Sequence, residues 1–258
     1  MASPVQSFKR LPGGLVIHEK TGTLEVQLLT SSIVHVIFSP GDKKPRLQHF
    51  VVTAKPRSVA FKMTNNVRSL ALFTTRFGIQ VNRATGALAF LRPDHSVILQ
   101  EPPAGARRFI TAMLNHHPVL EPQQTFIAKP DEVQYGMAET QDGMWNRRGM
   151  PIELQQLNTQ CAVPMMISSA GYGLLWNNAA LTLFNPIDHQ VALDAKGGGV
   201  FTADKSGQYV FMVRNGNRYA QIGVTLNGKI IKEIVNRWVP YTIAATGSFS
   251  FPFWRKIA

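Results

Sequence analysis

The sequence has 258 residues, of which 45% are hydrophobic and 16% charged. This balance excludes a disordered chain and is sufficient for a sizeable buried core. The formal net charge of +12 comes from 27 Lys and Arg against 15 Asp and Glu, but the basic residues stand mostly in isolated pairs beside turns, so nucleic-acid binding is not expected.

The chain lacks the sequence patterns expected for membrane insertion, export and metal binding. No apolar run reaches the roughly 18 residues of a membrane span, and no signal peptide is visible. We therefore expect no membrane contact and a cytoplasmic location for the chain as it stands, while a periplasmic or secreted parent protein stays open. The side chains of His116-His117 diverge on a strand, so no metal or other cofactor is expected. Cys161, the single cysteine, lies in an apolar run and is expected to be buried.

Alternation of apolar and polar residues predicts β-strands in the first half of the chain. The predicted strands cover residues 24–28, 34–38, 70–74, 77–81 and 88–91. Their spacing is typical of a β-sandwich or barrel built from antiparallel strands. Because no helical periodicity extends beyond about ten residues, the sequence cannot contain a (β/α)₈ barrel or a doubly wound sheet.

The second half of the chain is also predicted to be β. A hairpin is expected around Ala170-Gly171, and Gly197-Gly-Gly199 is interpreted as a flexible junction. Beyond it lie predicted strands at 208–213, 222–226 and 229–234, with hairpin turns at Asn215-Gly216 and Asn227-Gly228. We therefore predict an N-terminal β-sandwich domain over residues 1–196 and a smaller β module over 197–258.

Several motifs in a fixed order resemble a known family. They are Tyr135-Gly-Met-Ala-Glu139, Asn146-Arg-Arg-Gly149, Ile152-Glu-Leu-Gln-Gln-Leu-Asn-Thr159, and the segments 163–178 and 75–91. Together they resemble the N-terminal β-sandwich of glycoside hydrolase family 31, in its α-xylosidase branch, over most of residues 14–194. Residues 199–252 are similar, over a shorter stretch, to the protective-antigen-type β-sandwich module that some α-xylosidases insert into this domain.

The resemblance implies an all-β fold, with a large antiparallel, galactose-mutarotase-like β-sandwich and a second, incomplete β-sandwich module. It further implies the non-catalytic N-terminal portion of a retaining α-glycosidase that acts on α-linked xylo- or gluco-oligosaccharides. The two catalytic aspartates of that family lie on a C-terminal (β/α)₈ barrel. We therefore expect a truncated chain with no catalytic residue of its own, whose barrel-facing apolar surface is exposed and promotes oligomerisation.

The same resemblance suggests residues for sugar binding. By motif position, Asn158 and Thr159 belong to a loop that lines the sugar pocket and would hydrogen-bond sugar hydroxyls. Glu139 and Trp145 are further candidates, since carboxylates hydrogen-bond to sugars and Trp rings stack on them. Ala138 stands where the family usually has Gly, and a left-handed Ala would cost about 1 kcal/mol or more, so a strained turn is predicted here.

An alternative from another class is a stand-alone carbohydrate-binding or adhesion module. Its sugar platforms would be aromatic side chains such as Trp145, Trp238 and Tyr241. Such a module would bind oligosaccharides without any barrel, which separates it from an enzyme fragment. A third hypothesis, polyanion binding, predicts an affinity that falls steeply with salt.

Overall fold

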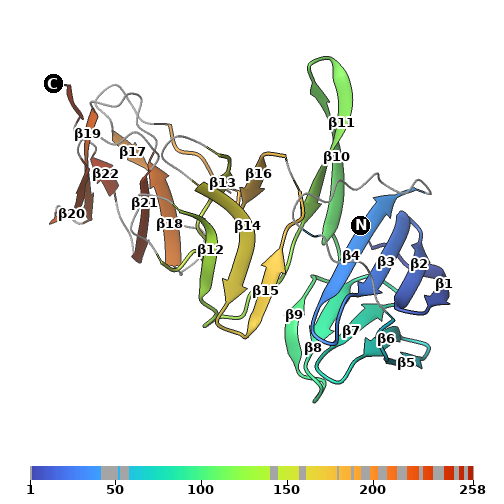
Figure 1. Cartoon of the computed structure of the whole chain (residues 1–258). Coiled ribbons are helices and arrows are strands. Elements are labelled where there is room, and N and C mark those ends of the chain that lie inside the picture. The colour runs from blue at the N-terminus through green and yellow to red at the C-terminus, as the bar shows by residue number, and fades with distance from the viewer. Residues whose placement is uncertain are drawn as a thin grey trace. The chain divides into compact units, whose positions relative to one another are not determined.

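The computed structural model describes most of the first 192 residues and the strands that follow. The described residues are 2–41, 52, 58–139, 145–156, 161–178, 180–186, 189–192, 198–202, 208–213, 220–226, 229–234, 241–246, 250–252 and 255–257. For 198–200 and the strands after residue 202, the description covers the backbone. All regular structure in these residues is β-sheet (Figure 1). Accordingly, they include no helix with the length and apolar character needed to cross a membrane.

The chain divides into two compact units. Unit 1 comprises Met1–Glu132 and Ala170–Tyr172, and unit 2 comprises Val133–Ser169 and Gly173–Ala258. The domain boundary predicted between residues 196 and 197 lies at the edge of a segment, 193–197, outside the described residues, and stays a prediction.

Unit 1 contains two antiparallel sheets and a hairpin. The first sheet has the order β1 (Val5–Leu11), β2 (Gly14–Glu19), β3 (Gly22–Leu28), β4 (Val34–Pro40). The second has the order β5 (Lys62–Asn65), β6 (Ser69–Phe73), β7 (Gly78–Asn82), β8 (Leu88–Leu91), β9 (Val97–Gln100). The hairpin consists of β10 (Arg107–Leu114) and β11 (His117–Gln124). Neighbouring strands in both sheets are consecutive in the chain, as expected for a meander.

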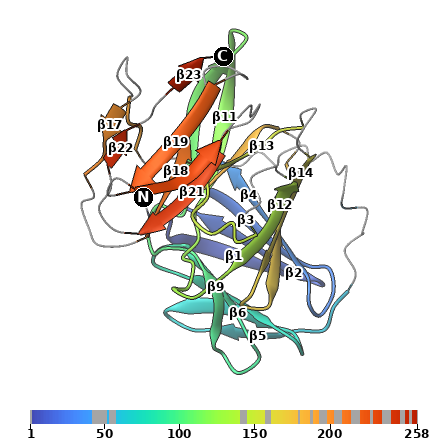
Figure 2. The ribbon, with the colours of Figure 1, turned by 90° about the vertical axis from the view of Figure 1, so that its left-hand side faces the viewer.

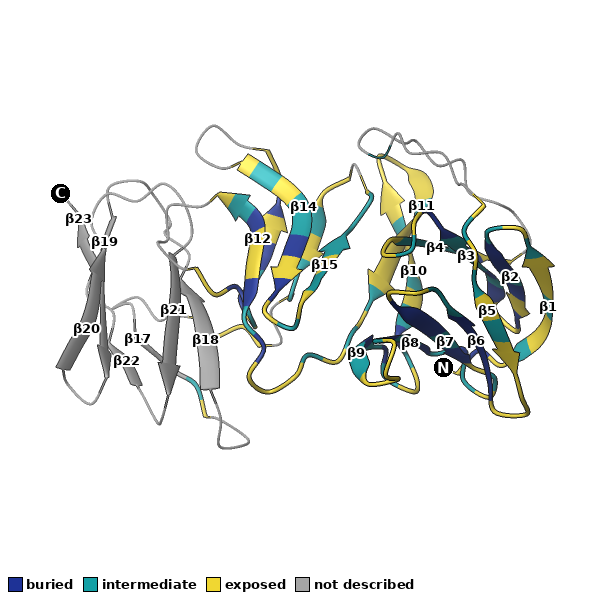
Figure 3. Ribbon diagram, turned by 60° about the horizontal axis from the view of Figure 1, so that its bottom comes forward, coloured by how far each residue is buried: buried dark blue, intermediate teal, exposed yellow. Residues whose placement is uncertain are grey.

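The core of unit 1 forms between the two sheets. Leu24, Val26 and Leu28 of β3 are fully buried and pack in one cluster with Leu72 and Ile79 of the second sheet. Along β3 the buried positions alternate with half-buried ones (Figure 3). Each such side chain contributes about 1.5–3 kcal/mol relative to an exposed position. The sequence thus correctly predicted β3, β4, β6, β7 and β8, and its alternation correctly predicted the buried face of β3.

Unit 2 contains several smaller antiparallel sheets. Its first strands are β12 (Gln134–Glu139), β13 (Ile152–Leu154), β14 (Cys161–Ser168), β15 (Tyr172–Leu175) and β16 (Thr182–Phe184). They form a sheet of order β12-β14-β15 and the pair β13-β16. β14 and β15 flank a turn with left-handed Gly171, which confirms the hairpin predicted at Ala170-Gly171.

The remaining strands of unit 2 are paired in three groups. They are β17 (Gly198–Val200), β18 (Gln208–Val213), β19 (Ala220–Leu226), β20 (Lys229–Ile234), β21 (Tyr241–Thr246), β22 (Ser250–Pro252) and β23 (Arg255–Ile257). The groups are β17-β22, β18-β21 and β20-β19-β23. The all-β, antiparallel fold class is therefore confirmed, whereas a protective-antigen-type identity for these strands stays a prediction.

Two local predictions in this region are corrected. Gly198 and Gly199 lie in β17 and pair with β22, so at least this part of the glycine run is strand and not a flexible junction. β18 pairs with β21 and not with the next strand, β19 (Figure 2). The β18–β19 hairpin predicted from Asn215-Gly216 is therefore not formed. By contrast, Leu226 pairs with Lys229, as predicted for a hairpin with two residues between its strands.

Candidate functional site

The motif Tyr135-Gly-Met-Ala-Glu139 forms most of strand β12, which pairs with β14 in an antiparallel ribbon. Gly136 lies opposite Met166, and Ala138 lies opposite Ala162, so the register shifts between them. Only Met137 lies between these positions on β12, whereas residues 163–165 lie between their partners on β14, so the extra residues of this β-bulge belong to β14; the Met137 side chain is buried. The bulge redirects the end of the strand that carries Glu139.

Glycine is required at one position of the motif. Gly136 has φ of +90°, and a Cβ atom there would lie 2.5 Å from the backbone oxygen of Met165. The next left-handed residue is Met137, with φ of +73°, and Ala138 has no positive φ. The left-handed conformation predicted at Ala138 therefore lies one residue earlier, at Met137.

Glu139 is exposed at the end of this ribbon and pairs with Cys161. Cys161 is exposed as well, which corrects the prediction of a buried thiol. Gln156 Oε1 accepts a hydrogen bond of 3.3 Å from the backbone N–H of Ala162. Gln156 and Ala162 lie on either side of Asn158 and Thr159 in the sequence. Asn158 and Thr159 themselves lie outside the described residues.

The residues that follow Trp145 are hydrogen-bonded to Gln134, at the other end of β12. Asn146 Oδ1 accepts hydrogen bonds from the backbone N–H of Gln134, at 3.2 Å, and of Arg148, at 3.1 Å. The Arg147 N–H donates to the Gln134 carbonyl at 2.7 Å. The side chain of Trp145 is 84% exposed. Gln134 and Glu139 are the two ends of β12, so Trp145 and Glu139 lie beside opposite ends of this strand.

One face of the ribbon is apolar and exposed. Tyr135, Val163 and Ile167 are between 40% and 54% exposed, whereas Met166 and Ser168 on the opposite face of β14 are buried. The alternation along β14 is visible in Figure 3. Apolar side chains grouped on an exposed sheet face are typical of a surface that another protein segment covers.

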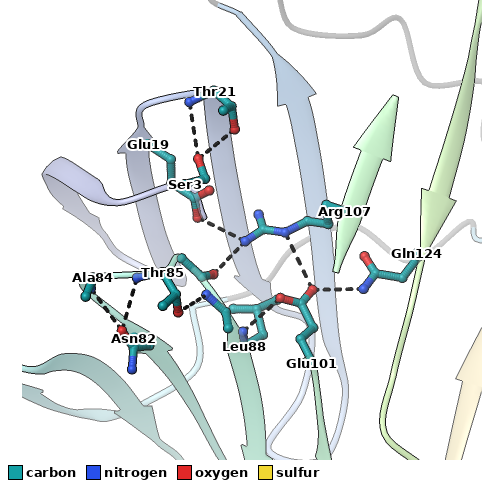
Figure 4. Close-up of polar contacts among 12 residues, drawn as sticks. Ser3, Glu19, Thr21, Asn82, Ala84, Thr85, Leu88, Glu101, Arg107 and Gln124 are labelled. Atoms are coloured by element: carbon teal, nitrogen blue, oxygen red, sulfur yellow. Dashed lines mark hydrogen bonds and ion pairs between the residues drawn. The ribbon is translucent and has the colours of Figure 1, made fainter. Parts of the chain in front are cut away.

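A buried ionic cluster in unit 1 was not predicted from the sequence (Figure 4). Arg107 Nη2 donates to Glu19 Oε1 at 3.2 Å and to the carbonyl oxygen of Gly86 at 2.5 Å, and Arg107 Nε lies 3.6 Å from Glu101 Oε1. The two carboxylate side chains are 0% and 1% exposed. Leu15, Ile17 and Glu19 alternate along β2 and share its buried face. This alternation is the sequence signal that could have predicted a buried Glu19.

The two carboxylates differ in how well they are hydrogen-bonded. Glu101 Oε2 accepts from the Leu88 N–H, and Glu101 Oε1 accepts from Gln124 Nε2, both at 2.9 Å. Glu19 Oε2 is buried and has no hydrogen-bond partner among the described residues. Burial raises the pKa of both carboxyls, and the nearby guanidinium of Arg107 partly offsets this rise. Carboxylates this inaccessible are suited to holding the sheets and the hairpin together, not to contacting a substrate.

Comparison with known proteins relates the chain to one family of glycosidases. No protein-family model matches it. Over 56 residues it is 46% identical to an uncharacterized family 31 glucosidase of Pseudescherichia vulneris and, also over 56 residues, 38% identical to α-xylosidase A of Aspergillus niger. Each match covers 22% of this chain, and 11% and 8% of the respective relative.

Solved structures extend this relationship to most of the chain. The family 31 α-xylosidase of Xanthomonas citri matches 96% of this chain with a TM-score of 0.72 and 20% identity. A family 31 α-xylosidase from a soil metagenome, complexed with xylose, matches 69% with a TM-score of 0.57 and 25% identity. In sequence over 56 residues, and in fold over most of its length, the chain is similar to the N-terminal β region of family 31 glycoside hydrolases. The chain covers 35% and 29% of those two solved chains.

Proposed function

We propose that the chain is the non-catalytic N-terminal portion of an α-glycosidase of the α-xylosidase or α-glucosidase type. In this proposal, the end of the ribbon that carries Glu139 contributes to the sugar pocket of a (β/α)₈ barrel outside this sequence. The observation that carries it is the pairing of Glu139 with Cys161, together with the hydrogen bond between Gln156 and Ala162, because these residues flank the positions of Asn158 and Thr159 in the sequence. The homology to family 31 supports the same conclusion.

The residue types at this ribbon end are suited to binding and not to bond cleavage. An amide at Asn158 and a hydroxyl at Thr159 can both donate to and accept from sugar hydroxyls, and an ionised Glu139 can accept. A retaining glycosidase needs two carboxyl groups about 5–5.5 Å apart across the glycosidic bond. We assign both of those groups to the barrel, so the role of this chain is to bind and orient the sugar.

The substrate class in this proposal is α-linked xylo- or gluco-oligosaccharides. Support comes from the bound sugars of structurally similar proteins, namely xylose in the soil-metagenome α-xylosidase and isomaltotriose in a dextranase of Flavobacterium johnsoniae. The exposed apolar face of Tyr135, Val163 and Ile167 also fits the proposal, because a longer chain would offer a barrel to cover it.

Two experiments test the proposal. The purified chain should release no nitrophenol from p-nitrophenyl α-D-xylopyranoside, and turnover that disappears in Glu139→Gln would disprove the non-catalytic role. The DNA downstream of codon 258 should encode a (β/α)₈ barrel. In that longer protein, Asn158→Ala and Thr159→Ala should each raise KM for the xyloside about 2- to 10-fold, the value of one hydrogen bond, whereas Asn178→Ala should leave KM unchanged.

The second candidate function is a stand-alone carbohydrate-binding or adhesion module, favoured by the exposure of Trp145. The side chains of Trp238 and Tyr241, its other proposed platforms, lie outside the described ones. Calorimetric titration of the chain with xyloglucan oligosaccharides separates the two candidates. Binding that is lost in Trp145→Ala supports a module that works alone, whereas the absence of binding supports the enzyme portion.

A further inference from the structure

The β10–β11 hairpin has two edges that differ chemically. Leu114 pairs with His117 around Asn115 and His116, which have φ of +48° and +64°. Two left-handed residues are typical of a type I′ turn, which is closed by a hydrogen-bonded pair. Hydrogen-bonded and non-hydrogen-bonded pairs then alternate along the hairpin, starting from Leu114–His117. This alternation decides which backbone groups point away from the hairpin.

The outer edge of β11 is blocked by proline. Pro118 and Pro122 lie opposite Met113 and Phe109, at pairs that the alternation makes non-hydrogen-bonded. At these positions a backbone N–H would point outward, but proline has none. Proline at outward positions of an edge strand prevents pairing with a further strand.

The outer edge of β10 is open. The outward-pointing backbone groups of β10 belong to Phe109, Thr111 and Met113, none of which is proline, and no described segment pairs with them. The hairpin extends away from the two sheets of unit 1 (Figure 1). Met113 and Leu114 are 66% and 62% exposed, so the side chains near its tip are apolar and exposed as well. An edge with these properties is suited to pairing with another strand.

We propose that the open edge of β10 pairs antiparallel with β10 of a second copy of this chain, with Thr111 opposite Thr111 at the two-fold axis. This register places Phe109 opposite Met113 of the second copy, and Ile110 opposite its Ala112. The four hairpin strands become one continuous sheet, joined by about six backbone hydrogen bonds from the three outward-pointing residues of each copy.

The charges of β10 favour a second copy in this orientation. Its cations, Arg107 and Arg108, are both at the base of the strand, and its tip carries no acidic or basic side chain other than histidine. Antiparallel pairing sets Arg108 of one copy against Leu114 of the other. Parallel pairing would instead set Arg108 against Arg108, and like charges directly opposite are destabilising. The strand is therefore complementary to itself in one direction only.

Two proline variants test which edge is used. Thr111 and Leu120 are directly opposite each other, and both have outward-pointing backbone groups. Thr111→Pro blocks the β10 edge, and Leu120→Pro adds a proline to the edge that already has two. Light scattering during size-exclusion chromatography over a wide concentration range should show a dimer for the unsubstituted chain and for Leu120→Pro. Thr111→Pro should weaken the dimer at least about tenfold, because it removes ladder hydrogen bonds.

A charge pair tests the orientation without changing the backbone. Leu114→Glu should strengthen the dimer at low salt by facing Arg108 of the other copy, and Leu114→Lys should weaken it, with both effects reduced at high salt. A chain that is monomeric at every concentration would overturn the proposal. So would equal effects of the two proline variants. If Thr111→Pro fails to fold by circular dichroism, the Leu114 variants decide, and the absence of opposite shifts would overturn it.

Discussion

Substitution of Arg107 by methionine should strongly destabilise unit 1. The guanidinium lies between two buried carboxylates, Glu19 and Glu101, and its side chain is 11% exposed. Methionine preserves much of the volume but removes the only cation of the cluster, which leaves two like charges facing each other. Breaking a buried ion pair from one side costs about 3–5 kcal/mol, and we expect a loss of this size in the free energy of unfolding near neutral pH.

The loss of unfolding free energy caused by Arg107→Met should depend on pH. The pKa of both carboxyls is raised above the ordinary value of 4.5, chiefly by burial. The folded state therefore binds protons that the unfolded state has released, so the contribution to stability is largest below about pH 4.5 and is lost as the pH rises through the raised values. Without Arg107 both pKa values rise further. The penalty of Arg107→Met should thus be smallest in acid and grow toward neutral pH.

Urea unfolding monitored by circular dichroism, repeated between about pH 5 and pH 8, measures this dependence. The control is Arg108→Met, since the neighbouring arginine is exposed and should change stability by less than about 0.5 kcal/mol. The triple variant Arg107→Met, Glu19→Gln, Glu101→Gln should recover part of the loss and remove the pH dependence. A penalty for Arg107→Met that is equal at both ends of the pH range, or equal to that of Arg108→Met, would refute the reasoning.

Three further predictions follow from single positions. Gly136→Ala should cost more than Gly171→Ala, by at least about 1 kcal/mol, because both have positive φ but only at Gly136 does the new Cβ meet backbone; equal melting temperatures would contradict this. Leu72→Ala should cost about 2–5 kcal/mol in urea unfolding, whereas Val67→Ala, at a position 94% exposed, should be nearly neutral. Exposed Cys161 should react with a thiol reagent in the native state about as fast as in urea, and slow labelling without denaturant would show that the thiol is covered.

The sequence by itself determined five strands of unit 1, β3, β4, β6, β7 and β8, and the buried face of β3. Leu24, Val26 and Leu28 alternate with polar residues, and such a period can be satisfied only by a strand with one buried face. Each of these three side chains is fully buried. The motifs around Tyr135-Gly-Met-Ala-Glu139 likewise sufficed to indicate the family, because residue types in a fixed order are a property of the sequence alone.

The tertiary structure decided features that depend on residues far apart in the chain. Arg107 contacts Glu19 across 88 residues, and no local pattern encodes which buried carboxylate faces which cation. The bulge in β14 lies opposite Met137, which has a positive φ, and the motif alone does not encode this pairing of β12 with β14. β18 likewise pairs with β21, although an Asn-Gly turn signal follows it in the sequence. Short-range signals determine how a strand can turn, whereas the packing of the whole sheet determines which strand lies beside it.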